Sequence, residues 1–172
     1  MARQAEVEFG PIEALVLSAS IFERAPIETV READLERTLR VNLVAPFGLA
    51  RELGLAMRSR GAGSIVTMLD WSSDRPRADY LPYEISKAAL AAATRGLAKC
   101  LAPEVRVNGV ALGAVLLPDG VSPQTVDAVV AATPLGRLGT PEDAVDTALY
   151  LLLEAEFATG AIWTLDGGRS LR

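Results

Sequence analysis

Histidine is absent from this chain of 172 residues, and cysteine occurs only once, as Cys100. Without histidine, a histidine-based catalytic triad and a zinc site with histidine ligands are both excluded. The single cysteine cannot form a disulfide within the chain. Cys100 lies in an apolar helical pattern, so we expect it to be buried filling rather than a nucleophile. We therefore expect no metal site, and any catalysis must come from other side chains.

Long hydrophobic runs and an excess of positive charge are also missing. No apolar run approaches the ~20 residues that a membrane-spanning helix needs, and residues 1–6 are too polar for a signal peptide. The net charge of −5, from 17 basic against 22 acidic residues, is opposite to the basic face that binds nucleic acid. We expect a cytoplasmic protein with no membrane or nucleic-acid partner. Half of the residues are hydrophobic, which predicts a single folded domain over residues 1–172.

Short apolar runs alternate with longer helical patterns along the chain. Strands are expected at Ile12–Leu17 and Ser64–Leu69, because both are short and continuously apolar. Between them, apolar residues at helical spacing predict one long helix from Thr29, as N-cap, to about Arg60, closed by Gly61. The remaining predicted elements are a helix over Tyr83–Leu101, a strand over Val105–Ala111, helices over Ser122–Ala132 and Thr140–Leu153, and a strand over Ala161–Leu165. Alternating strands and helices predict an α/β fold with a parallel sheet.

Tyr83 and Lys87 stand four residues apart, one turn from each other on the same face of a helix. A nearby ammonium stabilises the phenolate and is expected to lower the pKa of Tyr83 from its ordinary value of about 10. Such a tyrosine can give a proton to a carbonyl or imine, while a cofactor supplies the hydride. The same spacing also occurs as a solvated pair on surface helices. Its place after a predicted strand, where open α/β sheets hold their active sites, favours the catalytic interpretation.

Several segments together resemble the short-chain dehydrogenase/reductase family. They occur in the family's order across nearly the whole chain: residues 15–20, Val41-Asn42-Leu43, residues 63–66, Tyr83 with Lys87, residues 106–110 and Leu165-Asp166-Gly167-Gly168. The resemblance implies the C-terminal part of a Rossmann-like, doubly wound parallel sheet with flanking helices. It also implies reduction of a small molecule, with NADPH as cofactor and NADH as the alternative. The active form implied is a homo-oligomer that associates through its two long helices.

A narrower resemblance is to the pteridine reductases and the bacterial dihydromonapterin or dihydrofolate reductases. Asp70 stands 13 residues before Tyr83, where most of the wider family has serine and the pteridine reductases have aspartate. Ser20 and Phe22 resemble the segment in which an aromatic ring stacks on the pterin, and residues 165–172 resemble the bacterial members' ending. The resemblance therefore implies reduction of a dihydropterin or dihydrofolate, with Tyr83 as the proton donor.

The family's functional residues transfer to matching positions of this chain. Those implied to be catalytic are Tyr83, Lys87, Asp70 and Asn42, with Asn42 positioning Lys87 through a water. Those implied to bind the cofactor are Ala19, Ser20, Tyr83, Lys87, Gly113 and Val115, and those implied to bind substrate are Ser20, Phe22, Asp70 and Tyr83. Simpler interpretations stay open. Asn42 could satisfy nearby backbone groups, Phe22 could fill the core, and Asp70 could cap a turn or pair with Arg75 or Arg77.

The chain also departs from the family pattern. Leu112-Gly113 stands where family members carry Pro-Gly, and Ser18 replaces a common asparagine. No Gly-rich phosphate-binding turn is present, because the only early glycine, Gly10, follows no predicted strand. We therefore expect an N-terminally truncated Rossmann-like domain that begins just before the family's fourth strand. Two alternative hypotheses remain: a non-catalytic remnant that associates through its long helices, and a short-chain reductase of another carbonyl substrate.

Overall fold

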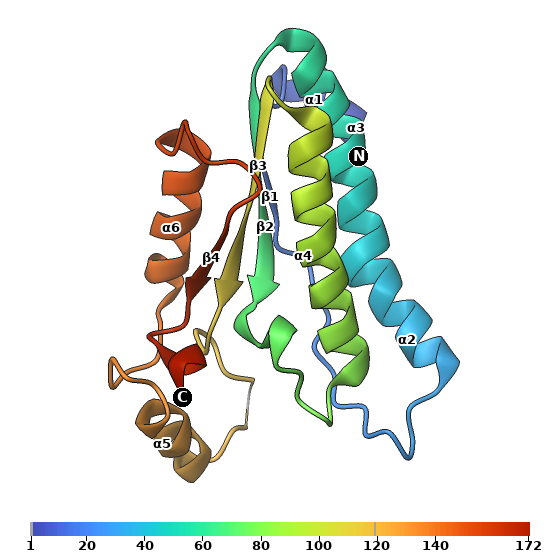
Figure 1. Cartoon of the computed structure of the whole chain (residues 1–172). Helices are drawn as coiled ribbons and strands as arrows, with labels where there is room; N and C mark the ends of the chain where they lie inside the picture. The colour runs from blue at the N-terminus through green and yellow to red at the C-terminus, as the bar shows by residue number, and fades with distance from the viewer. Residues whose placement is uncertain (1, 119) are drawn as a thin grey trace.

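The four strands form one parallel sheet. The structure, a computed structural model, describes residues 2–118 and 120–172. The strands are β1 (Ala14–Leu17), β2 (Gly63–Asp70), β3 (Val105–Leu112) and β4 (Ile162–Leu165), and their order in the sheet is their order in the chain. Figure 1 shows the sheet standing upright between its covering helices. The predicted α/β fold with a parallel sheet is confirmed.

Helices cover both faces of the sheet. On one face lie α3 (Ala45–Arg60) and α4 (Leu81–Leu101), with α6 (Pro141–Leu153) on the other (Figure 1). This arrangement is the doubly wound pattern that the sequence predicted, and it explains why the inner strands are apolar on both faces. The shorter helices are α1 (Ala2–Phe9), α2 (Glu32–Leu39), α5 (Pro123–Ala131), the 3₁₀ turns η2 (Trp71–Asp74) and η3 (Arg169–Leu171), and the π-helical turn η1 (Arg40–Val44).

The two faces carry separate hydrophobic clusters. Alternate residues of β2 and β3 point to opposite faces, so Ile65 and Val107 pack under α3 and α4 while Val66 and Val110 pack under α6. All four side chains are fully buried. The helices complete the clusters with small and aliphatic residues, among them Ala50, Leu53, Met57, Leu97 and Leu101 on the first face and Ala148, Leu151 and Leu152 on the second.

The long helix predicted after Thr29 differs at its start. It begins at Glu32, where the Asp34 carboxylate accepts the backbone N–H of Arg31 at 3.1 Å. Thr29 lies in a preceding turn and donates its hydroxyl to the carbonyl of Pro26, so its prediction as the N-cap was wrong. From Glu32 the chain stays helical through the π turn η1 to Arg60. Gly61 then ends the helix with φ of 88°, a left-handed conformation that favours glycine.

Two local features were not anticipated by the sequence patterns. Residues 2–9 form the helix α1, whose Glu6 carboxylate pairs with Arg60 at 3.1 Å and so ties the segment to the end of α3. Cys100 is exposed rather than buried. It lies in the last turn of α4, where the helix face that packs on α3 is supplied by Leu97, Ala98 and Leu101 instead.

The carboxyl ends of the strands meet at one edge of the sheet, the lower edge in Figure 1. Asp70 ends β2, paired in register with Leu112 of β3, and Leu112 is in turn paired with Leu165 of β4. This edge therefore collects the polar residues that follow each strand. Over residues 2–118 and 120–172, no helix is long and apolar enough to span a membrane, and no cluster of three acidic, histidine or cysteine residues is suited to a metal ion.

Candidate active site

Tyr83 and Asp70 lie at the centre of the polar edge, the sheet edge where the carboxyl ends of the strands meet. Tyr83 lies in the first turn of α4, whose start is set by Pro82, and it is 8% exposed. Its hydroxyl donates to Oδ2 of Asp70 at 2.8 Å. The spacing of 13 residues thus brings a strand end and a helix start into direct contact. Asp70 therefore accepts the Tyr83 hydroxyl directly, while its catalytic role stays a prediction.

The direction of the pKa shift of Tyr83 is opposite to the sequence-based expectation. Burial raises the pKa of Tyr83 above its ordinary value, and the Asp70 carboxylate raises it further by its charge and by accepting the hydroxyl. Lys87 was expected to lower this pKa, but its Nζ lies 5.7 Å from the ring centroid and donates elsewhere. The prediction that Lys87 lowers the pKa of Tyr83 was therefore wrong. At neutral pH Tyr83 is therefore a phenol with a proton to give.

Lys87 is buried beneath Tyr83. Its side chain is 4% exposed, and Nζ donates to the backbone carbonyl of Met68 at 2.8 Å. Burial lowers the pKa of Lys87 to about 8, opposed by the nearby charge of Asp70. An ammonium carries three hydrogens, and one of them goes to Met68. Lys87 therefore keeps donor capacity for a hydroxyl group placed beside it.

Burial of Lys87 leads to a prediction about stability against pH. The pKa of about 8 in the folded chain lies below the ordinary lysine value of 10.5, so between these two pH values only the unfolded chain binds the proton. Unfolding free energy should therefore rise with pH across this window. Relative to Lys87→Met, wild type should gain about 3 kcal/mol between pH 8 and 10.5. Urea unfolding at several pH values measures this. The exposed lysine Lys99, changed to Met, is the control and should show no such difference.

Asn42 joins two parts of the site through direct hydrogen bonds. It is fully buried in η1, and its Oδ1 accepts the backbone N–H of Ile21 at 2.8 Å. Its Nδ2 donates to the Ile21 carbonyl at 2.9 Å and to Oγ of Ser86 at 3.0 Å. Asn42 thus clamps the segment after β1 to α4. The direct partners of Asn42 are backbone groups and a serine. These contacts agree with the simpler interpretation from the sequence, in which Asn42 satisfies nearby backbone groups. A role toward Lys87 stays a prediction.

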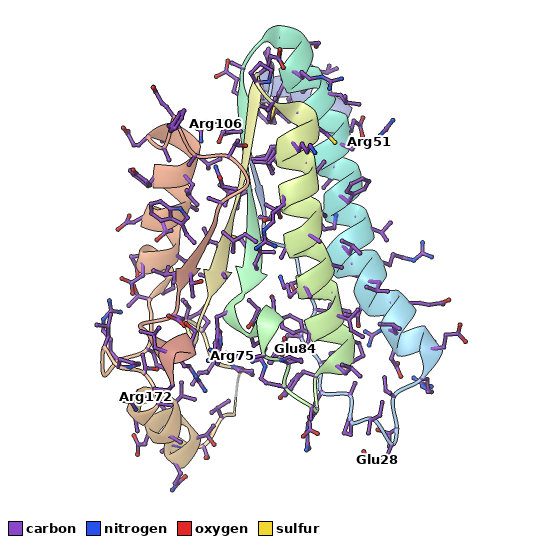
Figure 2. The ribbon with its side chains drawn as sticks, viewed as in Figure 1. Glu28, Arg51, Arg75, Glu84, Arg106 and Arg172 are labelled. Carbon is purple, nitrogen blue, oxygen red and sulfur yellow. The ribbon has the colours of Figure 1, made fainter. Side chains whose placement is uncertain are left out.

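The site is completed by three polar residues to which the sequence analysis assigned no functional role. The Arg77 guanidinium donates to Oδ2 of Asp70 at 3.1 Å and to Oε1 of Glu84 at 2.6 Å. Oγ of Ser72 lies 2.6 Å from Oδ1 of Asp70 and 2.8 Å from Oε2 of Glu84. Figure 2 shows Glu84 at the lower end of α4, near the η2 turn. The charged residues before Tyr83 were the one sequence feature that pointed to these contacts. They led to the Asp70–Arg77 ion pair as an alternative interpretation of Asp70.

An aromatic shelf lies beside Tyr83. The rings of Phe22 and Tyr80 are stacked with centroids 4.5 Å apart and planes 2° apart. Phe22 also meets the Tyr83 ring edge to face at 4.7 Å, and the guanidinium of Arg77 lies 5.1 Å from its centroid. Phe22 remains 39% exposed, so it is not core filling. The predicted substrate residue therefore lies next to the predicted proton donor, with one ring face already covered by Tyr80.

Other residues implied to bind the cofactor lie apart from this contact network. Ala19 and Ser20 are exposed in the segment after β1. Gly113 gives its backbone N–H to Leu165 at 2.9 Å, and a Cβ there would lie 2.6 Å from the Cα of Asp166. Only glycine fits this approach. Val115 packs near Gly139. Among the described residues, no hydrogen bond or ring contact joins Ser20, Gly113 or Val115 to Tyr83, so their assignment stays a prediction.

A parallel α/β sheet that sets a tyrosine–lysine helix against a strand end is the architecture of a nicotinamide-dependent oxidoreductase. The chain belongs to the short-chain dehydrogenase/reductase family: the family model described as enoyl-(acyl carrier protein) reductase matches residues 1–170. This family consists of NAD(P)-dependent oxidoreductases. The family resemblance stated from the sequence is thereby confirmed, while no relative reported below is named as a pteridine reductase.

Several of the similar proteins are named as dehydrogenases. Galactitol 2-dehydrogenase of Agrobacterium fabrum is 31% identical over 98% of this chain and 72% of its own length. The 7alpha-hydroxysteroid dehydrogenase of Escherichia coli is 30% identical over 94% of this chain and 65% of its own length. Among solved structures, a gluconate 5-dehydrogenase from Burkholderia cenocepacia in complex with NADP and tartrate gives a TM-score of 0.93 at 27% identity. It is matched over 99% of this chain and 69% of that protein.

Proposed function

We propose that this chain carries the catalytic end of an NAD(P)H-dependent reductase, in which Tyr83 protonates the substrate as a hydride is delivered to it. The hydrogen bond from Tyr83 to Asp70 carries this proposal. Reduction needs a proton donor at this position, whereas alcohol oxidation needs a base. Burial and the Asp70 charge both keep the proton on Tyr83, since they raise its pKa. At neutral pH Tyr83 is therefore in the protonated form that the reductive direction requires.

The donor set at the polar edge fits the nicotinamide ribose of NADPH. Lys87 would donate to a ribose hydroxyl with the hydrogens that Met68 does not take. Ala19 and Ser20 would line the same edge from the end of β1, and Gly113 and Val115 from the end of β3. A bound nicotinamide supplies the hydride. Tyr83 supplies the proton, and Asn42 keeps the β1 segment and α4 at a fixed separation through Ile21 and Ser86.

The first substrate class is a dihydropterin or dihydrofolate. Two observations support it: Asp70 stands on the hydrogen-bond line of Tyr83, and the Phe22–Tyr80 stack lies beside it. A flat heterocycle could extend this aromatic shelf toward the tyrosine. Ser20 would lie at the rim of the same pocket as a further substrate contact.

A carbonyl of a sugar, sugar acid or steroid is the second candidate, favoured by a different observation. Asp70 already receives four hydrogen bonds, from the N–H and O–H of Ser72, from Arg77 and from Tyr83. Four is the number an ionised carboxylate accepts, so Asp70 has no lone pair left for a pterin amino group. The similar proteins named above act on galactitol, gluconate and hydroxysteroids.

Two properties of the whole protein belong to this proposal. The unit is part of a Rossmann-like domain, supported by its coverage of 65% to 72% of the relatives reported above. Copies associate through α3 and α4, supported by apolar side chains on those helices that remain exposed, namely Phe47, Leu55 and Ile85. Such side chains are more often covered in an assembly.

The deciding experiment is turnover with NADPH against a panel holding a dihydropterin, dihydrofolate, a keto-gluconate and a ketosteroid. We expect reduction to keep its rate through neutral pH, and oxidation of the matching product to rise as the solution becomes alkaline. Fluorescence titration with NADPH should show saturable binding that Lys87→Ala abolishes. Folded protein without NADPH binding or turnover would overturn the proposal and favour the non-catalytic remnant.

A further inference from the structure

Arg77 is fixed near the start of α4 by an ion pair with Glu84. Its Nε donates to Oε1 of the glutamate at 2.6 Å, and the Glu84 side chain is 2% exposed. The other oxygen, Oε2, lies 2.8 Å from Oγ of Ser72, which sets the direction of the carboxylate. A buried carboxylate needs a paired cation, because burial penalises an unpaired charge. Glu84, labelled at the lower end of α4 in Figure 2, therefore anchors the guanidinium.

The same guanidinium shares an acceptor atom with the Tyr83 hydroxyl. Nη2 of Arg77 donates to Oδ2 of Asp70 at 3.1 Å, and the Tyr83 hydroxyl donates to this same atom at 2.8 Å. The tyrosine oxygen and this nitrogen of Arg77 therefore lie no more than two hydrogen-bond lengths apart. Because a guanidinium does not lose its proton in proteins, this positive charge is permanent.

Lys87 is bound differently, although it is as close to the tyrosine ring. Nζ of Lys87 and Cζ of Arg77 both lie 5.7 Å from the centroid of the Tyr83 ring. Lys87 gives a hydrogen to the carbonyl of Met68, whereas Arg77 bonds to the carboxylate that accepts the tyrosine hydroxyl. The charge of Arg77 opposes the rise in the pKa of Tyr83 that burial and Asp70 cause. Arg77 is thus the cation that acts on the hydroxyl.

Arg77 also contacts the aromatic shelf. Its Cζ lies 5.1 Å from the centroid of the Phe22 ring and 5.4 Å from that of the Tyr80 ring. A guanidinium is attracted to aromatic rings within about 6 Å. One side chain therefore contacts the shelf, the proton donor and the carboxylate that accepts the donor's hydrogen. This shared contact keeps the parts of the site in a fixed relation to one another.

Transfer of the Tyr83 proton creates a need for positive charge at this point. In the proposed reduction the O–H bond of Tyr83 breaks, the proton forms a new bond on the substrate, and a phenolate remains. The phenolate lies beside the Asp70 carboxylate, and the two negative groups repel each other. Asp70 also loses one of the hydrogens that it accepted. Arg77 keeps its own hydrogen bond to Oδ2 and places its charge beside both groups.

We propose that Arg77, rather than Lys87, is the cation that stabilises the negative charge left on the Tyr83 oxygen as its proton moves to the substrate. This inference rests on the proposed function, since it concerns the same reaction. The hydride adds to the substrate carbon, the proton adds to the neighbouring oxygen or nitrogen, and water returns a proton to the phenolate after the product leaves. Arg77 acts through its charge and through Asp70, so it is a positioning residue. Lys87 is left to bind the ribose.

The other charged groups that face Tyr83 come from two elements. Asp70 ends β2, while Glu84 and Lys87 lie on α4. Burial raises the pKa of Tyr83 most, Asp70 and Glu84 raise it further by their charge, and Arg77 lowers it. A variant that removes only Arg77 leaves Glu84 buried without its cation, which destabilises the fold. The effect of Arg77→Gln is therefore measured in a background that also carries Glu84→Gln.

Fluorine NMR of the chain without ligand tests the charge directly. The chain holds three tyrosines, Tyr80, Tyr83 and Tyr150, so a fluorinated tyrosine with a more acidic hydroxyl gives three signals to titrate. A sample with Tyr83→Phe identifies the signal of Tyr83. Adding Arg77→Gln to Glu84→Gln should lower the ionisation constant of Tyr83 by at least roughly tenfold. An equal ionisation constant with and without Arg77→Gln would overturn the inference.

Two further variants separate charge from structure. Arg77→Lys keeps a cation with three donors, enough for both carboxylates, and should hold the ionisation constant of Tyr83 within about threefold of wild type. Arg75→Gln is the matched control, because Arg75 is exposed and donates to the backbone oxygens of Ser170 and Arg172. It should leave the Tyr83 signal unchanged. A shift in Arg75→Gln as large as that from Arg77→Gln would indicate a general effect of surface charge and overturn the assignment.

Turnover with NADPH tests the consequence for the reaction. Adding Arg77→Gln to Glu84→Gln should lower kcat for reduction roughly tenfold and leave NADPH affinity unchanged. Oxidation of the product should rise only at a higher pH, because the phenolate forms later. A slower rate with an unshifted pH profile would show a structural role alone and contradict the inference. If wild type lacks turnover while the ionisation of Tyr83 depends on Arg77, the proposed function fails and the electrostatic assignment of Arg77 stands.

Discussion

Tyr83→Phe is expected to lower the rate of substrate reduction by about 10²–10⁴, the range attributed to a positioned general acid. The ring stays in place because its edge-to-face contact with Phe22 does not involve the hydroxyl. Only the hydrogen donated to Asp70 and to the substrate is lost. Steady-state oxidation of NADPH with the substrate identified from the panel measures the effect. The loss should appear in kcat with little change in NADPH affinity, since Lys87 remains.

The matched control is Tyr150→Phe. Tyr150 lies on α6, on the opposite face of the sheet, where its ring is tilted against Trp163 at 5.3 Å. Removing its hydroxyl should leave turnover within about twofold of wild type, because surface changes away from the site have small effects. Equal turnover of Tyr83→Phe and wild type would show that the proton comes from another group.

Asn42→Ala is expected to lower the free energy of unfolding by about 2–4 kcal/mol, because it leaves two partly buried backbone groups of Ile21 without this partner. Both the N–H and the carbonyl of Ile21 bond to this side chain, and Ser86 loses a donor as well. The same change releases the segment that carries Phe22 from α4. Turnover per folded molecule should therefore fall together with stability. Chemical denaturation and activity on the same samples measure the two effects.

The other asparagine of the chain provides a close control. Asn108 is also fully buried, and it clamps the Ala158 carbonyl at 2.7 Å and the Ala161 N–H at 3.1 Å. Asn108→Ala should cause a similar loss of stability, because each asparagine bonds one backbone carbonyl and one backbone N–H. It should leave turnover per folded molecule close to wild type, since these groups precede β4 and do not contact Tyr83. If both variants lose turnover equally, Asn42 has only a structural role.

Much of the fold follows from local patterns that the sequence displays. The continuous apolar runs of β2 and β3 are stable chiefly in a sheet that is covered on both faces. The spacing of Tyr83 and Lys87 is fixed by helical geometry alone. The position of Asp70 relative to Tyr83 could be predicted only by resemblance to a family, because a strand end and a helix start are brought together by the intervening segment.

The sequence by itself determined the class of fold, the doubly wound sheet, and the helix that presents Tyr83 and Lys87. The tertiary structure alone decided the charge state of the site. Burial and the Asp70 carboxylate raise the pKa of Tyr83, whereas the spacing of Tyr83 and Lys87 predicted the opposite. It also decided that Arg77, Ser72 and Glu84 join the site. The physical reason is that desolvation and charge depend on every neighbour in space, while sequence periodicity reports only neighbours along one element.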